Sequence, residues 1–180
     1  SYNAARTIDE VLSRIPEVLF RSDRYSCEVL LIDDCSVDCT FDLALALKSR
    51  YASMPITVIQ NPVNLGYGGN QKTGYQYAID NNFDVVALLH GDGQYAPEDL
   101  PRLLEPLIDE KCDAVFGSRM LNKSSAMRGG MPLYKFFGNI ILTAIQNSLI
   151  GSGLSEFHSG YRLYSVAKLK QIPFDLNSSD

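Results

Sequence analysis

The 180-residue sequence lacks any run of lysine or arginine, and its formal net charge is −5 at pH 7. Nucleic-acid binding depends on clustered positive charge that replaces counterions along the phosphate backbone, so we expect no nucleic-acid partner. Internal repeats and low-complexity linkers are missing too. A hydrophobic content of 46% is enough for a sizeable core. We therefore expect one domain over residues 1–180.

The four cysteines form no CxxC pair, and only two histidines are present. A structural zinc site needs four suitably spaced cysteine and histidine ligands. We therefore expect no zinc site and four reduced thiols, at Cys27, Cys35, Cys39 and Cys112.

No signal peptide opens the chain, and no stretch of about 18 uncharged apolar residues is present to span a bilayer. The longest apolar segment, Phe136 to Ile150, follows Lys135 and is interrupted by Asn139, Gln146 and Asn147. It predicts a buried or interfacial helix. We expect a cytoplasmic protein, and an interfacial helix would allow it peripheral contact with the inner face of the membrane.

Short β-rich apolar runs alternate with helical patterns, which is typical of an α/β protein with a mostly parallel, Rossmann-like central sheet flanked by helices. The expected strands are Glu28–Ile32, Ile56–Gln60, Val85–Leu89 and Ala114–Gly117. Apolar residues at helical spacing predict a helix over Leu100–Ile108. The polar, glycine-rich segment 122–130 predicts a loop that can act as a lid. The first residues lead into a helix at 7–14 with no strand before it, so we expect a chain truncated at both ends.

Polar residues follow the expected strands at their carboxyl ends, where open parallel sheets bind ligands. Carboxylates hold hard cations, and glycines let a backbone approach phosphate closely, so this composition suits a metal-bound, phosphorylated ligand. Each cluster alone also fits a turn or a surface ion pair. The clusters are Asp33, Asp34 and Ser36; Asn64 and Gly66; His90, Asp92 and Gln94; and Arg119.

The segment 66–73 reads GYGGNQKT and nearly fits the phosphate-binding pattern GxxxxGK(S/T). Gln71 stands where that pattern requires a glycine, and the dinucleotide pattern GxGxxG fails at the same residue. A nucleotidyltransferase or P-loop-like nucleotide hydrolase is thus a weaker alternative. A non-catalytic module that binds a sugar nucleotide is the alternative without chemistry.

Five short motifs occur in the order in which family 2 glycosyltransferases of the GT-A fold carry them. Residues 1–3 read SYN, 31–40 read LIDDCSVDCT against VVDDGSxDGT, 64–66 read NLG against NxG, 117–119 read GSR, and 159–162 read SGYR against SGFR. The sequence resembles this family over nearly its whole length, particularly the polyprenyl-phosphate branch typified by dolichyl-phosphate mannosyltransferase. The resemblance implies a nucleotide-diphospho-sugar transferase fold and a single glycosyltransferase catalytic domain. It also implies that the apolar segment Leu133 to Ile150 lies near a lipid acceptor, with a core or dimer-interface helix as the alternative.

The resemblance also implies a nucleotide-sugar site. Asp34 would contact the base of a nucleoside-diphosphate sugar, and Asp33 would support the same pocket. Ser36, Asn64 and Gly66 belong to the matching motifs and complete this set.

A divalent cation, Mg²⁺ or Mn²⁺, is implied at the donor diphosphate. Asp92 and Gln94 match the second acid and the glutamine of the family's DxDxQ, and His90 occupies the position of its first acid. A neutral imidazole supplies no charge, so the ion is expected to depend more on Asp92 and on the donor phosphates.

The implied reaction is attack by an acceptor oxygen on the anomeric carbon, a single displacement that inverts its configuration. A lipid phosphate is already ionised and needs no strong base, whereas a sugar hydroxyl does; the sequence leaves both acceptors open. Glu156 and His158 are candidate bases, with orientation of the active-site loop as the alternative role for both. The implied catalytic residues are Asp92, Arg119, Glu156 and His158. Arg119 is also expected to bind phosphate of the donor or the acceptor. The expected acceptor-binding residues are Lys135 and Arg162.

Overall fold

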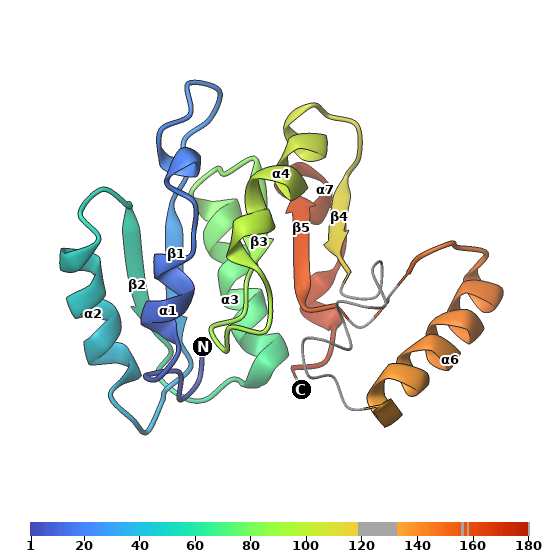
Figure 1. The fold of residues 1–180 in the computed structure, drawn as a ribbon, viewed down its shortest axis with the longest axis horizontal. Coiled ribbons are helices and arrows are strands. Elements are labelled where there is room, and N and C mark those ends of the chain that lie inside the picture. The colour runs from blue at the N-terminus through green and yellow to red at the C-terminus, as the bar shows by residue number, and fades with distance from the viewer. Residues whose placement is uncertain (119–132, 156, 158, 180) are drawn as a thin grey trace.

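The computed structural model describes residues 1–118, 133–155, 157 and 159–179, and only the backbone of 133–137. Helices and strands alternate along most of this chain (Figure 1). The strands are β1 (Val29–Asp33), β2 (Ile56–Gln60), β3 (Val85–Leu88), β4 (Ala114–Gly117) and β5 (Tyr161–Ser165). The α-helices are α1 (Ile8–Ser13), α2 (Thr40–Arg50), α3 (Gly66–Asp80), α4 (Leu100–Ile108), α6 (Leu133–Ile150) and α7 (Val166–Leu169). Short 3₁₀ helices lie at Glu17–Phe20, Pro97–Asp99 and Phe174–Leu176.

The strands form two hydrogen-bonded groups in the described part of the chain. β1 pairs in parallel with β2, and the register sets Asp33 beside Gln60. β5 lies between β3 and β4 and is antiparallel to both, so β3 and β4 run parallel to each other. The α/β class and the four expected strands are confirmed. β5 was not foreseen, and its two antiparallel ladders qualify the expected mostly parallel sheet.

The first residues and helix α3 connect the two groups of strands. The Asp34 N–H donates to the Ser1 carbonyl at 2.7 Å, while Gly91, after β3, lies so close that an added Cβ would be 3.5 Å from the Ser1 Cβ. Helix α3 packs against both β1 and β3. The loops that follow β1 and β3 are thereby held at the same edge of the fold.

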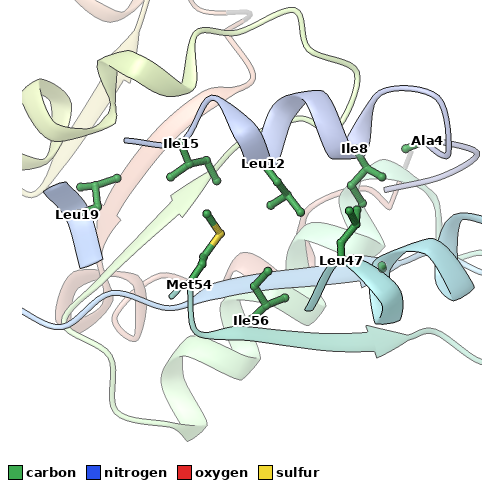
Figure 2. Packing of buried hydrophobic residues seen from close by; sticks show 9 residues of the cluster. Ala4, Ile8, Leu12, Ile15, Leu19, Leu47, Met54 and Ile56 are labelled. Carbon is green, nitrogen blue, oxygen red and sulfur yellow. The ribbon is translucent and has the colours of Figure 1, made fainter. Parts of the chain in front are cut away.

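The main apolar core lies beneath α1, where the helix faces α2 and β2 (Figure 2). Ile8, Leu12 and Ile15 recur at intervals of four and three residues, so one stripe of this segment is apolar and buried. Leu47 and Ile56 meet this stripe from α2 and β2. A second cluster surrounds the fully buried Leu163 of β5, so β5 is a central strand of its group.

Helix α6 extends along one side of the molecule (Figure 1) and leaves large apolar side chains uncovered. Ile141, Leu142, Ile145 and Leu149 are each at least half exposed, whereas Thr143 is 6% exposed. Since these residues face solvent, the expectation of a helix buried in the core is wrong. In the described ranges no helix is both long enough and apolar enough to cross a membrane.

Candidate functional site

Two adjacent carboxylates, Asp33 and Asp34, are almost fully buried at the end of β1, with exposures of 2% and 3%. The Asp33 carboxylate accepts hydrogen bonds from the Ser36 N–H at 3.2 Å, from the Ser36 hydroxyl, and from the Gln60 amide at 3.1 Å. A buried charge is tolerated when such donors surround it. Asp33 therefore fixes the turn that presents Asp34.

The Asp34 carboxylate connects the ends of β1 and β2 to the start of α3. Its Oδ1 atom accepts from the Asn61 amide at 2.7 Å and from the Leu65 N–H at 2.9 Å. Asn64 Oδ1 accepts the Gly66 N–H at 3.0 Å, and Gly66 has a φ of +75°, which a glycine adopts without strain. The structure thus places Asp33, Asp34, Ser36, Asn64 and Gly66, five of the residues expected to bind the nucleotide sugar, close together at the end of β1 and the start of α3.

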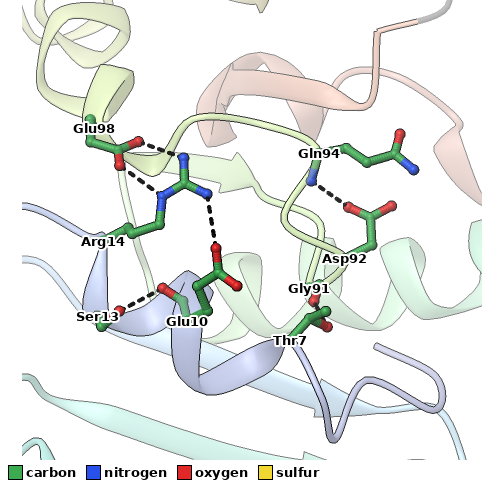
Figure 3. Close-up of polar contacts among 8 residues, drawn as sticks. All are labelled: Thr7, Glu10, Ser13, Arg14, Gly91, Asp92, Gln94 and Glu98. Atoms are coloured by element: carbon green, nitrogen blue, oxygen red, sulfur yellow. Dashed lines mark hydrogen bonds and ion pairs between the residues drawn. The ribbon is translucent and has the colours of Figure 1, made fainter. Parts of the chain in front are cut away.

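Asp92 and Gln94 lie on the glycine-rich loop after β3 (Figure 3). Asp92 Oδ1 accepts the Gln94 N–H at 3.0 Å, and both side chains lie on the same side of the loop. Nearby, the Thr7 hydroxyl donates to the Gly91 carbonyl at 2.5 Å, which fixes the loop to the start of α1.

The donor set at this loop suits a weakly held divalent cation. No group of three or more histidine, cysteine or acidic side chains is placed to hold a metal among the described residues. Asp92 and Gln94 offer one carboxylate and one amide oxygen. These hard oxygen donors fit Mg²⁺ or Mn²⁺ when phosphate oxygens and water supply the other ligands.

A bidentate ion pair supports this loop from α1. Arg14 donates from Nε to Glu98 Oε1 at 2.7 Å and from Nη2 to Glu98 Oε2 at 3.0 Å (Figure 3). The hydrogen bond from Arg14 lowers the pKa of Glu98. Because Glu98 belongs to the 3₁₀ helix that follows the loop, the pair fixes the direction in which the chain leaves Gln94.

A second polar region is a pocket of about 410 Å³ between the start of α3, the loop after β3 and the start of β5. His90 Nε2 lies 3.0 Å from the Tyr67 hydroxyl, and the imidazole is 5.2 Å from the rings of both Tyr67 and Tyr95. The Gly160 N–H donates to the Tyr95 hydroxyl at 2.7 Å. In the described part of the chain the lining residues are Tyr67, His90, Tyr95, Ser159, Gly160 and Arg162.

Sequence reasoning missed Tyr67 and Tyr95. Tyr67 lies in the segment considered only as a phosphate loop, and Tyr95 directly follows the metal-motif glutamine. Neither tyrosine belongs to a recognisable sequence motif, so only the folded structure shows that both line the pocket.

Other expected site residues fall outside the described part of the chain. Arg119, Glu156, His158 and the expected lid at 122–130 are among them, as is the Lys135 side chain. Their roles stay predictions, as does metal ligation by His90.

The start of α3 does not have the contacts of a P-loop. The Ser179 carbonyl accepts the N–H groups of Gly68 and Gly69 at 2.9 and 3.4 Å. Lys72 Nζ donates to the carbonyls of Asp175 and Asn177 at 3.0 and 2.6 Å. The chain's own C-terminal segment therefore takes the amide and ammonium groups that a P-loop would offer to phosphate.

The fold and the acids at its strand ends define an α/β enzyme of the GT-A type. The family model for glycosyl transferase family 2 matches residues 1–172, and the chain belongs to this family. It is a glycosyltransferase domain, which excludes the nucleotide hydrolase.

Two curated relatives act on polyprenyl phosphates according to their names. The UDP-N-acetylglucosamine–dolichyl-phosphate N-acetylglucosaminyltransferase of Methanococcus voltae is 27% identical, over 99% of this chain and 72% of its own length. The undecaprenyl-phosphate mannosyltransferase of Micrococcus luteus is 29% identical, over 97% of this chain and 68% of its own.

Two solved glycosyltransferases share the fold. A mannosyltransferase from Pyrobaculum calidifontis, in complex with GDP-Man and Mn²⁺, has a TM-score of 0.65 at 18% identity. Glucosyl-3-phosphoglycerate synthase from Mycobacterium tuberculosis, in complex with UDP, has a TM-score of 0.61 at 20% identity. The alignments cover 100% and 96% of this chain but only 47% and 57% of those proteins.

Cys35 generates a prediction about the acidic turn. Its φ is +57°, a left-handed conformation that costs a residue with a Cβ about 1 kcal/mol. We expect Cys35→Gly to be more stable than Cys35→Ala by about 1 kcal/mol in urea unfolding. At Cys112, whose φ is not in the left-handed range and which caps no helix, the order should reverse because glycine only adds entropy to the unfolded chain. The same sign at both positions would contradict the assigned strain.

Proposed function

We propose that the protein transfers a sugar from a nucleoside-diphosphate sugar to a polyprenyl phosphate, with inversion at the anomeric carbon. The observation that carries this proposal is the meeting of two acidic loops, after β1 and after β3, next to a pocket whose described lining contains an arginine and no acid. The names of the two curated relatives support the acceptor class. The GDP-Man and UDP complexes of the solved neighbours support the donor class.

In the proposed donor site, Asp34 contacts the nucleotide base. Asp33 keeps the Asp34 turn in place through its hydrogen bonds with Ser36 and Gln60. Asp34 accepts both observed hydrogen bonds through Oδ1. Neither of these bonds uses Oδ2, so that oxygen is the one proposed to contact the base. Asn64 and Gly66 form the neighbouring wall at the start of α3.

Asp92 and Gln94 are proposed to hold the divalent cation together with the donor diphosphate. Such an ion neutralises the charge of a departing diphosphate. The Gln94 N–H keeps the Asp92 carboxylate in place at 3.0 Å. With so few protein ligands, the ion should bind weakly alone and tightly with the nucleotide.

The acceptor phosphate is proposed to bind Arg162, with Lys135 and Arg119 as further cationic groups. Arg162 Nε donates to the Ser159 carbonyl at 2.6 Å, which orients the guanidinium. A cationic pocket favours an anionic lipid phosphate over a neutral sugar hydroxyl. The ionised phosphate oxygen attacks without a strong base, and Glu156 and His158 then orient the loop.

Helix α6 is proposed to contact the membrane that contains the lipid acceptor. Its polar residues Asn139, Thr143 and Asn147 recur every four residues on the less exposed side, and Asn147 bonds the Leu154 backbone. The opposite side presents aliphatic side chains to solvent. This inverted polarity suits an apolar environment, and α6 has no acidic residue to repel anionic lipids.

Loss of the metal ligand tests the proposed reaction. We expect Asp92→Asn to lower the rate of sugar transfer to a polyprenyl phosphate about 100-fold, or about 2.7 kcal/mol, because the departing diphosphate loses its counter-charge. The donor is chosen by a thermal-shift screen of nucleotide sugars with Mn²⁺. Mn²⁺ should raise nucleoside-diphosphate affinity in the wild type and do so less in the variant. The exposed Asp23→Asn serves as the control. Undiminished transfer in excess chelator, or by Asp92→Asn, would refute the proposal.

The contact of α6 with lipid is tested by flotation with vesicles that contain anionic lipid. Replacing Leu142, Ile145 and Leu149 by serine should reduce vesicle binding about tenfold or more, since each buried aliphatic side chain contributes about 1.5–3 kcal/mol. The control replaces Val37 and Leu176, which are 83% and 84% exposed elsewhere, by serine. Wild type that stays unbound, or a triple variant that floats equally well, would exclude the membrane. A dimer that dissociates on the same replacement would assign the face to a second copy.

A further inference from the structure

The pocket beside the metal loop has an unusual charge for this acidic protein. Among the six lining residues that the structure describes, one is an arginine and none is an aspartate or glutamate, although the chain carries a net charge of −5. The remaining lining groups include the hydroxyls of Tyr67 and Tyr95 and the imidazole of His90. Such a lining of donors and a cation is chemically suited to an anion.

Arg162 enters this pocket without a carboxylate partner in the part of the chain that the structure describes. Nε donates to the Ser159 carbonyl at 2.6 Å and Nη2 to the Phe157 carbonyl at 3.4 Å. These neutral carbonyls orient the guanidinium but supply no counter-charge to it. Burial raises the pKa of Tyr67, and the positive charge of Arg162 opposes this rise. The charge of Arg162 therefore acts on the Tyr67 hydroxyl.

His90 is held against the pocket wall rather than open to a ligand through Nε2. That atom lies 3.0 Å from the Tyr67 hydroxyl, and a Cβ added to Gly160 would overlap it. The ring also packs at 5.2 Å from Tyr95. Tyr67, in contrast, is half exposed and can reach both His90 and solvent in the pocket. His90 can therefore act on a ligand through Tyr67.

We propose that Tyr67 and Arg162 form a phosphate-binding subsite and that His90 is the positioning residue that holds the Tyr67 hydroxyl in it. When His90 Nε2–H donates to the Tyr67 oxygen, the phenolic proton is directed to a phosphate oxygen. An acid at position 90 would instead accept that proton and place a negative charge near Arg162. His90 thus serves this subsite in place of the metal.

The phosphate can belong to the acceptor lipid or to the donor diphosphate, and direct binding separates the two. The probes are inorganic phosphate, farnesyl phosphate, and GDP or UDP with Mn²⁺, titrated calorimetrically. Tyr67→Phe should weaken phosphate binding about tenfold, which corresponds to one hydrogen bond to a charged group. Tyr77→Phe is the matched control on the same helix, because its hydroxyl bonds Glu28 at 2.7 Å instead. A loss confined to farnesyl phosphate assigns the subsite to the acceptor, and a loss confined to the nucleotides assigns it to the donor.

Substitutions of His90 test the positioning role. His90→Gln keeps a donor near Tyr67 and should bind phosphate nearly as the wild type does, whereas His90→Phe should match the Tyr67→Phe loss. His90→Asp should bind phosphate at least tenfold more weakly and leave Mn²⁺ affinity in the presence of nucleotide unchanged. In sugar transfer, His90→Phe should raise the KM for the phosphate ligand more than it lowers kcat.

Two results would overturn the subsite. One is binding of every probe by Tyr67→Phe as tightly as by the wild type; the other is a gain of Mn²⁺ affinity in His90→Asp without any loss of phosphate binding. The subsite takes the identity of its ligand from the proposed function, but its test needs no turnover. Phosphate binding that depends on Tyr67, in a protein that transfers no sugar, would keep the subsite and refute the function. Sugar transfer that is unchanged by substitution of Tyr67 and of His90 would keep the function and refute the subsite.

Discussion

The structure depends on the burial of two neighbouring carboxylates at the end of β1. Removing a charge from water costs several kcal/mol unless hydrogen bonds replace the lost hydration. Asp33 obtains these bonds from Ser36 and Gln60, and Asp34 from Asn61 and the Leu65 N–H. These donors lie in the turn, at the end of β2 and at the start of α3. The two charges therefore fix the relative positions of three elements, and the same elements form the proposed nucleotide site.

Strand β5 has a comparable role on the other side of the site. In its antiparallel register Arg162 lies opposite Leu88, the last residue of β3, and opposite Phe116 of β4. The loop that carries His90 and Asp92 begins directly after Leu88. The Arg162 guanidinium therefore lies at the edge of the sheet where the acidic loops begin. Arg162 is the second residue of β5, and it lies at this edge because β5 is antiparallel to β3. In a parallel strand the second residue would lie at the opposite edge, away from the acidic loops.

Sequence patterns predicted the parts of the fold that follow from apolar periodicity. The four apolar strands and α4 lie within one residue of their expected bounds, because uniform burial leaves a clear signal. β5 reads YRLYS and alternates buried and partly buried residues, so its polar letters concealed a central strand. The acidic turn was found by its motif. Tyr67 and the orientation of His90 were not, because they depend on contacts between residues 23 positions apart.

The proposed reaction brings together two substrates that both carry phosphate, and like charges repel more strongly where water is partly excluded. In that proposal a cation held by Asp92 and Gln94 would compensate the charge of one substrate, and the side chains of Asp92 and Gln94 are themselves acidic or neutral. The phosphate of the second substrate needs a positive charge of its own, one that the Asp92 carboxylate does not neutralise. The end of β3 separates the two requirements: Asp92 contacts Gln94, while His90, two residues earlier, contacts Tyr67 and Gly160. Because β3 ends at Leu88, the alternation of a strand no longer forces residues 90 and 92 to the same face. The presence of His90 instead of an acid then fits an Arg162 that has no carboxylate partner among the described residues, since a carboxylate at position 90 would bring a negative charge into the pocket that Arg162 lines and reduce the attraction of the guanidinium for phosphate.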